Sequence, residues 1–174
     1  SAIAEIYGHY VTHTAISFEL EAPSAAEMGE RVLQIQKRYP WLVMEEKGIV
    51  QGYAYASLHR ERAAYRWCAE VSVYLRPAAH GRGIGSELYR ELFQKLKTLG
   101  YIHLYAGITL PNAASVALHE AYSGMWAANF ARGSHMSWNR VMAEESADWP
   151  PRENPITAIR AGSTWYVAAF ARSQ

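Results

Sequence analysis

Residues 71–100 read VSVYLRPAAHGRGIGSELYRELFQKLKTLG, and this stretch decides the fold. From Val71 to Leu75, apolar side chains alternate with polar ones, which is the period of a β-strand. Pro77 ends the strand because proline cannot extend a hydrogen-bonded ladder. Leucines then recur at helical spacing, and Gly100 stands where the C-terminus of a helix favours glycine. The stretch predicts a strand, a glycine-rich loop and a helix, in that order.

The loop between strand and helix, HGRGIG at residues 80–85, has the composition of an anion site. Its glycines let the backbone approach a phosphate where a Cβ atom would clash, and the start of a helix offers free N–H groups and a positive dipole end. The spacing differs from the G-x-G-x-x-G of a dinucleotide site and from a P-loop, in which lysine and Ser or Thr follow the last glycine. On the loop alone, an anion site and a plain strand-to-helix connection both remain open.

Composition limits the class of protein. The chain has 174 residues, half of them hydrophobic, which predicts one globular domain. A net charge of +1 gives no argument for nucleic acid or an anionic membrane. The single cysteine, Cys68, excludes an internal disulfide and suits a reducing compartment. Because there is no apolar run near the ~20 residues of a membrane span, and no signal peptide, we expect a cytoplasmic protein without nucleic-acid or membrane partners.

Helices and a hairpin are predicted ahead of the loop. Ser24 and Glu27 form a capping box that opens a helix, and this helix stops at Pro40. The elements in order are a helix within residues 1–15 without a cap, an extended segment at 14–20, the helix from Ser24, and a hairpin of 41–44 and 49–56 around a turn at 46–48.

Strands alternate with helices in the middle of the chain. A basic loop at 58–64 precedes a long strand at 65–75, and a second strand is predicted at 101–108. Asn112 is the expected N-cap of a short helix. The connection between the two strands is long enough for a crossover, so we expect a mixed α/β sheet with parallel neighbours in its middle.

The glycine loop resembles the acetyl-CoA loop of the GNAT N-acetyltransferases, whose pattern is Arg/Gln-x-x-Gly-x-Gly/Ala. Here His80 stands in the first position in place of Arg or Gln, so one permanent charge is absent, while Arg82 lies inside the loop. The resemblance implies acetyl-CoA as co-substrate, no metal, and the GNAT fold: a mixed central β-sheet flanked by helices in a single domain.

Further segments resemble the phosphinothricin acetyltransferase branch of this family. They are SFELE (17–21), RYPWLV (38–43), AYRWCAEVSVYL (64–75) and GITLPNAASVALHEA (107–121). The resemblance implies acetyl transfer to the α-amino group of a small amino acid or analogue, such as phosphinothricin or methionine sulfoximine or sulfone, by a homodimer. We therefore expect residues 1–174 to form one N-acetyltransferase domain, with a family-like core at 3–121 and a divergent part at 122–174.

Two residues are candidates for the proton transfers. An amine that is mostly ammonium at neutral pH needs a base, and Glu70 matches the base of the branch; it is in phase with Ser72 and Tyr74 on the strand, and apolar neighbours would raise its pKa. His119 stands where many GNAT enzymes place a general-acid tyrosine, and histidine titrates near neutrality. The alternatives are an ordinary solvent-facing glutamate and a structural histidine. The remaining histidines, at 9, 13, 59, 80, 103 and 135, are interpreted as surface or packing residues.

The resemblance also implies residues that hold the two substrates. The acetyl-CoA set is Val73, Tyr74, Leu75, His80, Gly81, Arg82, Gly83, Ile84, Gly85, Ser86, Asn112 and Ser115, with the backbone amides of Val73 and Leu75 pairing with the pantetheine arm. A substrate carboxylate needs a cation, preferably arginine. The acceptor set is Phe18, Arg60, Arg62 and Tyr65, of which Phe18 would shape the pocket.

The C-terminal third departs from the branch. Residues 125–130 and 136–142 are expected to form a short hairpin around 132–134. The family's opening strand, roughly Ile-Arg-x-Ala-Thr, is absent from residues 1–10, but Ile159-Arg160-Ala161 resembles it. We therefore hypothesise that residues 156–170 supply this edge strand, as in a circular permutation.

Two classes of function fit the sequence. The first is an amino-acid N-acetyltransferase. The second is a non-catalytic acyl-CoA-binding or sensing domain that has kept the cofactor loop, although the presence of both Glu70 and His119 argues against it. Among enzymes, the alternative acceptor is another small amine or a peptide N-terminus.

Overall fold

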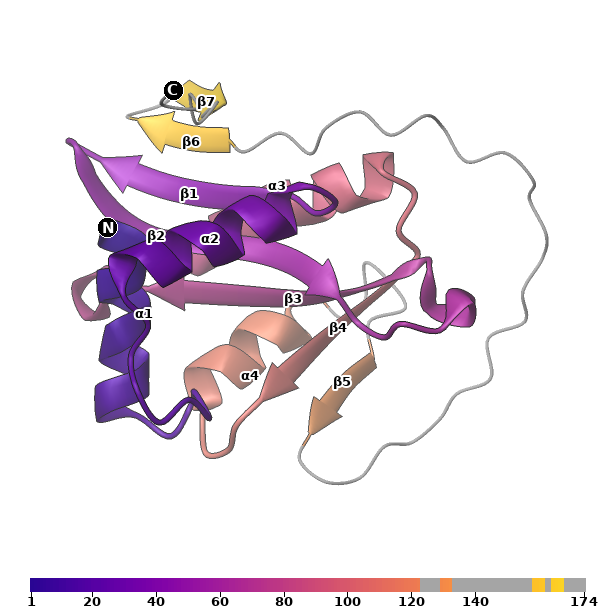
Figure 1. Ribbon diagram of the computed structural model, residues 1–174, viewed down its shortest axis with the longest axis horizontal. Helices are drawn as coiled ribbons and strands as arrows, with labels where there is room; N and C mark the ends of the chain where they lie inside the picture. Colours follow the sequence, from indigo (N-terminus) through magenta and orange to yellow (C-terminus); the bar gives the residue numbers. More distant parts are fainter. Residues whose placement is uncertain (123–128, 133–157, 162–163, 168–174) are drawn as a thin grey trace.

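The computed structural model describes residues 1–122, 129–132, 158–161 and 164–167, the last three ranges by their backbone alone. These residues form a seven-stranded sheet in the order β5-β4-β3-β2-β1-β6-β7 (Figure 1). The strands are β1 Trp41–Glu46, β2 Ile49–Leu58, β3 Cys68–Leu75, β4 His103–Ile108, β5 Asn129–Arg132, β6 Ala158–Ala161 and β7 Thr164–Val167.

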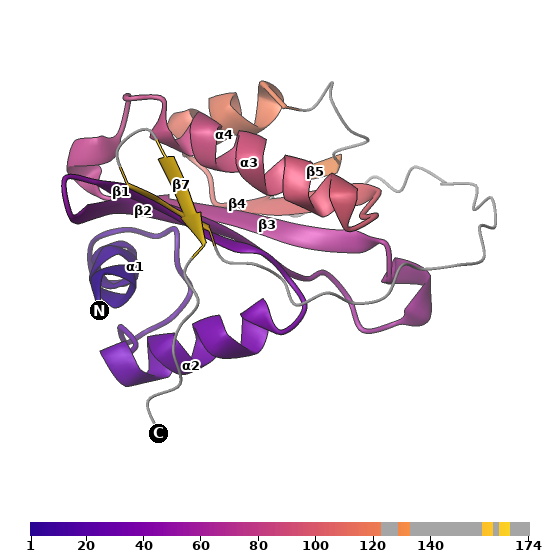
Figure 2. The ribbon, with the colours of Figure 1, turned by 90° about the horizontal axis from the view of Figure 1, so that it is seen from above.

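Helices cover both faces of the sheet. Helices α1 and α2 lie on one face, and α3 and α4 lie on the other (Figure 2). Their bounds are α1 Ala2–His13, α2 Ala25–Gln36, α3 Ile84–Thr98 and α4 Ala113–Glu120, with 3-10 turns η1 Ala63–Tyr65 and η2 Pro77–Ala79. This layering confirms the predicted mixed α/β architecture. Within the described part of the chain, no helix is both long and apolar enough to cross a membrane.

Local sequence sets the helix starts. Ser24 accepts from the Glu27 N–H and the Glu27 carboxylate accepts from the Ser24 N–H, so the predicted capping box is confirmed. Asn112 caps α4, as predicted. The expectation that α1 has no cap is wrong, because the Ser1 hydroxyl accepts from the Ala4 N–H at 3.4 Å.

The predicted hairpin is the antiparallel pair β1 and β2. Lys47 and Gly48 at its turn both have positive φ, 51° and 77°, the combination that matches the twist of paired strands. Helix α2 ends at Gln36 rather than at Pro40, and β4 begins at His103 rather than at Tyr101. Two further segments differ from expectation. The long strand begins at Cys68, because Ala63–Tyr65 forms a 3-10 turn, and residues 14–20 form an irregular connection without strand pairing.

Each face of the sheet has its own apolar core. Against α3, Leu88 and Leu92 pack on small sheet residues such as Ala54. Against α1 and α2, the core is aromatic: Trp41 stacks with both Tyr53 and Tyr55, at centroid distances of 5.3 and 4.2 Å. The strand period therefore sends Glu70, Ser72 and Tyr74 of β3 to the α1/α2 face.

The sheet opens between its two central strands. Strands β3 and β4 are parallel, but their pairing covers three residue pairs and ends at Glu70 and Tyr105, although β3 continues to Leu75 and β4 to Ile108. On its other side, β3 stays paired with β2 from Ala69 to Leu75. The unpaired part of β3 therefore presents backbone groups to the opening.

The predicted edge strand joins the sheet. Strand β6 pairs in parallel with β1, with Val43 opposite Ile159, and β7 pairs with β6 (Figure 1). At the other edge, β5 pairs in parallel with β4, so Arg132 belongs to a strand where a turn was expected. Residues 123–128 and 133–157 lie outside the described residues, as does the expected strand at 136–142.

Candidate active site

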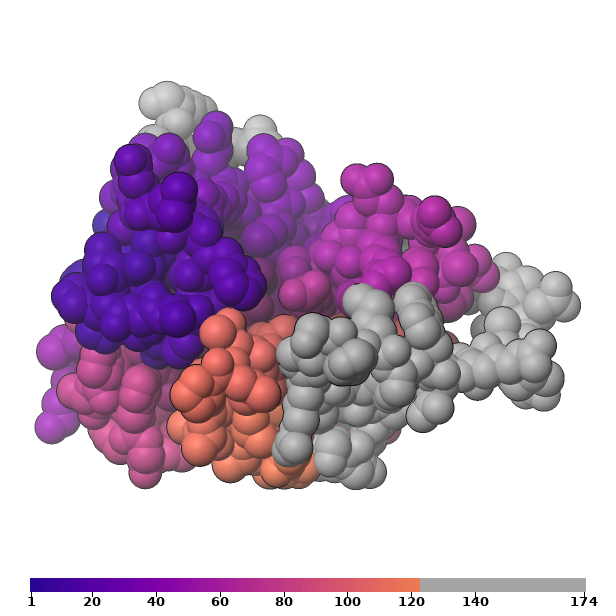
Figure 3. All heavy atoms as spheres, turned by 90° about the horizontal axis from the view of Figure 1, so that it is seen from below, coloured from indigo at the N-terminus to yellow at the C-terminus, as the bar shows by residue number. Residues whose placement is uncertain are grey.

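A cavity of about 510 Å³ fills the opening between β3 and β4. It is lined by Tyr10 of α1, by Val71–Leu75 of β3, by the glycine loop and by residues of α4, among them His119. Helix α1, the glycine-loop region and α4 adjoin one another on one face of the molecule (Figure 3). Because it takes residues from both layers of helices, the cavity connects the two faces of the sheet.

Backbone groups of β3 face the cavity. The Tyr10 hydroxyl donates to the Leu75 carbonyl at 2.7 Å, and the Leu75 N–H donates to the same hydroxyl at 3.3 Å. The backbone N–H and carbonyl of Leu75 thus both point away from β2. Since alternate residues of a strand point their amides to the same side, Val73 directs its N–H and carbonyl to the cavity as well.

The Tyr10 hydroxyl also meets the glycine loop, at 3.0 Å from His80 Nε2. Its one proton is given to Leu75, so His80 is the donor in this second contact. Neither contact was expected from the sequence. The backbone N–H of Leu75, predicted to pair with the pantetheine arm, already bonds the Tyr10 hydroxyl. The N–H of Val73 is therefore the clearer donor for an extended ligand.

The glycine loop has the conformation of an anion cradle. Gly81 and Gly83 have φ of 70° and 77°, and a Cβ added to either would meet open space. Gly83 is the N-cap of α3, and the Gly83 carbonyl accepts the first intrahelical bond, from the Glu87 N–H. The N–H groups before Glu87 are left for a ligand at the positive end of the helix. The loop therefore fits a phosphate group.

Most of the predicted acetyl-CoA residues line this one cavity. They are Val73, Tyr74, Leu75, His80, Gly81, Gly83, Ile84, Gly85, Ser86, Asn112 and Ser115. Arg82 does not line it: its guanidinium pairs with Glu46 at 2.7 Å, in the strand β1 that precedes the hairpin turn. The two side chains are 36 residues apart in sequence, which is why the loop pattern does not reveal the pair.

His119 faces the cavity with both ring nitrogens engaged. Nδ1 lies 2.7 Å from the Ser115 carbonyl, an acceptor, so Nδ1 carries the proton. Nε2 then accepts from the Tyr89 hydroxyl at 2.9 Å. The side chain is 4% exposed, and burial lowers the pKa of His119. The neutral ring has no proton free at Nε2.

Tyr89 is a cavity residue that sequence reasoning missed. It lies on α3 at a position that reads as core, it is fully buried, and burial raises the pKa of Tyr89 well above its ordinary value. The phenol therefore keeps its proton and directs it at His119. The helical spacing of α3 predicts that Tyr89 faces inward, but the polar contact depends on α4.

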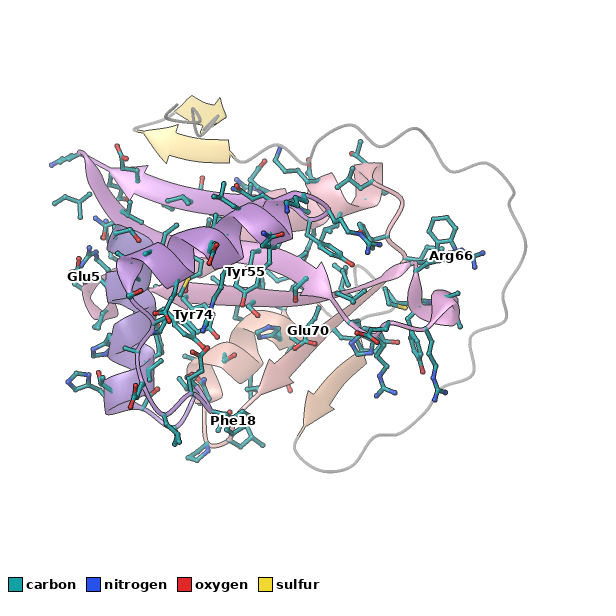
Figure 4. All side chains as sticks on the ribbon, in the orientation of Figure 1. Glu5, Phe18, Tyr55, Arg66, Glu70 and Tyr74 are labelled. Atoms are coloured by element: carbon teal, nitrogen blue, oxygen red, sulfur yellow. The ribbon has the colours of Figure 1, made fainter. Side chains whose placement is uncertain are left out.

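Glu70 lies beside the cavity, at the last residue pair before β3 and β4 diverge (Figure 4). Its Oε1 would be 4.0 Å from a Cβ added to Gly107, a residue of the cavity lining. Its side chain is 44% exposed, and burial of the rest raises the pKa of the Glu70 carboxyl, the direction expected of a base.

His59 is the second side chain that sequence reasoning missed. The sequence indicates a surface or packing residue, but His59 Nδ1 lies 3.8 Å from Glu70 Oε2. The ring stacks on Tyr105 at a centroid distance of 3.9 Å and an angle of 7°. Glu70 lies on β3 and His59 lies in the bend after β2, so no local pattern shows the contact.

The predicted acceptor residues fall into two groups. Arg60 and Tyr65 lie together, with the guanidinium 5.3 Å from the ring centroid, and Tyr65 meets His59 edge-on. Arg62 is exposed at the start of η1. Phe18 is 89% exposed and is not in the cavity lining, so the structure does not show it shaping the pocket (Figure 4). Ile16, two residues earlier, lines the cavity instead.

Comparison with known proteins places this site in a family. The model of the acetyltransferase (GNAT) family matches residues 8–125. The chain belongs to this family. Among relatives of this GNAT chain, a phosphinothricin N-acetyltransferase of Streptomyces viridochromogenes is 34% identical, over 91% of this chain and 90% of that protein. An L-methionine sulfoximine/L-methionine sulfone acetyltransferase of Salmonella typhimurium is 37% identical, over 70% of this chain and 71% of that protein.

A solved structure supports the same assignment. The GNAT superfamily phosphinothricin acetyltransferase of Sinorhizobium meliloti, in complex with acetyl-CoA, is 42% identical, with a TM-score of 0.66. The similarity covers 69% of this GNAT chain and 66% of that chain. The family resemblance and the fold class expected from the sequence are confirmed.

Proposed function

We propose that this protein transfers the acetyl group of acetyl-CoA to the amino group of a small amino acid or analogue of the phosphinothricin or methionine sulfoximine and sulfone type. One observation carries the proposal: a single cavity joins the N-terminus of α3 on one face of the sheet to the region of Glu70 on the other. An acyl donor and an amine acceptor that approach from opposite faces would meet between β3 and β4. The names of the relatives supply the substrate class.

The residues present fit acetyl-CoA. The open space at Gly81 and Gly83, with free N–H groups at the start of α3, suits its phosphates. The N–H and carbonyl of Val73 suit an amide-containing arm laid along β3. When bound, acetyl-CoA supplies the activated acetyl group. Fixing both reactants in one cavity lowers the entropic part of the barrier.

Glu70 is proposed as the base. Its carboxylate accepts a proton from the acceptor ammonium, and the raised pKa brings it closer to neutral pH, where proton transfer is most effective. His119, predicted from the sequence as a general acid or base, is proposed to act through Tyr89. Nε2 orients the Tyr89 hydroxyl, which holds the proton available on this wall of the cavity.

The test is release of free CoA from acetyl-CoA, with phosphinothricin, methionine sulfone, methionine sulfoximine, glutamate and a polyamine as acceptors. We expect turnover on the first three. In Glu70→Gln we expect kcat to fall by about 10²- to 10⁴-fold, and the acid limb of the pH profile to disappear. Turnover on the polyamine alone, or undiminished activity of Glu70→Gln, would contradict the proposal. Acetyl-CoA binding without any turnover would favour a sensing domain.

The proposal extends to a homodimer, which the resemblance implies, and to a location in the cytoplasm, which the single cysteine favours. Light scattering after gel filtration measures the mass in solution. A mass near the 19.6 kDa of one chain would contradict the dimer.

A further inference from the structure

We propose that His59 is a positioning residue that holds the Glu70 carboxylate where it receives the proton of the acceptor amine. This inference rests on the proposed function, in which Glu70 is the base. It concerns a residue that the sequence places in a loop after β2, with no motif around it.

The geometry aims His59 at Glu70. His59 Nδ1 is buried and lacks a hydrogen-bond partner among the described residues, and Glu70 Oε2 lies 3.8 Å away. A buried polar nitrogen without a partner is costly, so native structures rarely keep one without a reason. The distance is about 0.6 Å longer than the upper limit of an N–H···O hydrogen bond, and we expect a rotation of the partly exposed Glu70 side chain to close it.

The two partners differ in freedom. His59 is held, because its ring stacks flat on Tyr105 and meets Tyr65 edge-on, at centroid distances of 3.9 and 5.7 Å. Its side chain is 14% exposed, against 44% for Glu70. The fixed imidazole therefore sets the position of the more mobile carboxylate.

His59 and Glu70 meet at the point where β3 and β4 diverge. Glu70 and Tyr105 form the last pair of β3 and β4, so the ring that supports His59 and the carboxylate that it faces lie side by side where the cavity begins. The titratable and charged groups around the pair, within the described chain, are Arg60 beside His59, Tyr65 of η1, Cys68 of β3, Tyr105 of β4 and Tyr55 of β2.

The protonation states agree with a donor role. Burial, and secondly Arg60, lower the pKa of His59, so the ring is neutral at neutral pH with one proton. While Glu70 is ionised, that proton is favoured on Nδ1, because a lone pair there would face the carboxylate. An Nδ1–H donor stabilises the ionised carboxylate and orients the oxygen that receives the amine proton.

Two substitutions separate this role from packing. His59→Phe keeps a flat ring on Tyr105 and removes the nitrogen, whereas His59→Asn loses the ring and keeps an N–H donor near the Nδ1 position. The pKa of Glu70 is read by NMR of ¹³C-labelled glutamate carboxyls, assigned with Glu70→Gln, and this readout needs no turnover. His13→Phe, at the exposed end of α1, is the control.

We expect His59→Phe to raise the pKa of Glu70 by about half a pH unit or more, because the ionised form loses a donor. His59→Asn should restore part of the difference. The acid limb of kcat/KM should move with it, about threefold in rate for half a unit. An unchanged Glu70 pKa and pH profile in His59→Phe would overturn the inference, as would a larger defect in His59→Asn.

The failure of the proposed function would look different. If the wild-type chain releases no CoA with any amine, the proposed function fails, while the NMR titration still decides whether His59 and Glu70 interact. If turnover is present and the titrations of wild type and His59→Phe coincide, only the role of His59 fails.

Discussion

Burial favours the uncharged form of both Glu70 and His119. It raises the pKa of the Glu70 carboxyl and lowers the pKa of the His119 imidazole. A neutral histidine accepts the Tyr89 hydrogen bond, and a carboxylate of raised pKa binds the proton of an amine more firmly. The two groups lie beside one cavity, so the low polarity of its walls serves both.

Glu70 should cost stability at neutral pH. Its folded-state pKa lies above the unfolded value of 4.5, so its favourable contribution is complete below that value and is lost as the pH rises through the folded pKa. Glu70→Gln, which is neutral at every pH, should therefore have a higher Tm than wild type at pH 7 and the same Tm near pH 4. Solvent screening keeps the gain small, because the side chain is 44% exposed. A lower Tm of Glu70→Gln at pH 7 would contradict this.

His119 should make the fold sensitive to acid. Its folded-state pKa lies below the unfolded value of 6.5, so its contribution is present above pH 6.5 and is lost as the pH falls through the folded pKa. Urea midpoints of wild type should fall over this window, and His119→Gln should show less of the fall. His13→Gln serves as the exposed control. Identical pH slopes for wild type and His119→Gln would argue against a buried neutral ring.

At the scale of elements, the start of α3 links the sheet to the ligand. The Gly83 N-cap turns the chain from the loop into the helix, and Gly85 packs so close to α4 that a Cβ there would lie 3.3 Å from Leu118 Cδ2. The amides of this turn can meet a phosphate only if both the turn and the packing are kept.

Gly83→Ala should weaken binding of acetyl-CoA. A Cβ at φ 77° costs about 1–2 kcal/mol of backbone strain, although the space around it is open. We expect KM for acetyl-CoA to rise with a smaller change in kcat, measured by CoA release. The matched control is Gly29→Ala in α2, which has no atom within 4 Å of its added Cβ and should stabilise the chain by about 0.5–1 kcal/mol. Equal effects of the two substitutions would contradict the role of the turn.

At the scale of the whole molecule, the chain closes one edge of its sheet with its own C-terminal part. Strand β6 is separated from β1 by more than a hundred residues, yet it pairs with it through four residue pairs. Without β6, β1 would present unpaired backbone groups to other chains.

Truncation tests this edge. A chain that ends at residue 157 should unfold at lower urea concentration and self-associate in light scattering, because the edge of β1 is exposed. A chain that ends at residue 167 keeps β6 and β7 and should behave like the full chain. If both truncated chains match the full chain, the pairing of β6 contributes nothing to stability.

Much of the fold could be predicted from short stretches of sequence. The capping box of α2, the Asn112 cap, the hairpin turn and the glycine loop are each set by residues within a few positions of one another, and the structure confirms each. The absent cap of α1 was misjudged because Ser1 stands at the first position, where no preceding pattern marks it.

The sequence by itself determined the starts of α2, α3 and α4 and the succession of strand, loop and helix over residues 71–100, because these depend on local hydrogen bonding and periodicity. The residues expected to line the cavity came from the family resemblance. Only the tertiary structure decided which side chains meet there. Tyr10 reaches Leu75 across 65 positions and Tyr89 reaches His119 across 30. The pairing of Arg82 with Glu46 and the approach of His59 to Glu70 likewise arise when separate elements pack. Contacts between elements depend on how layers stack and where β3 parts from β4, which no local spacing specifies.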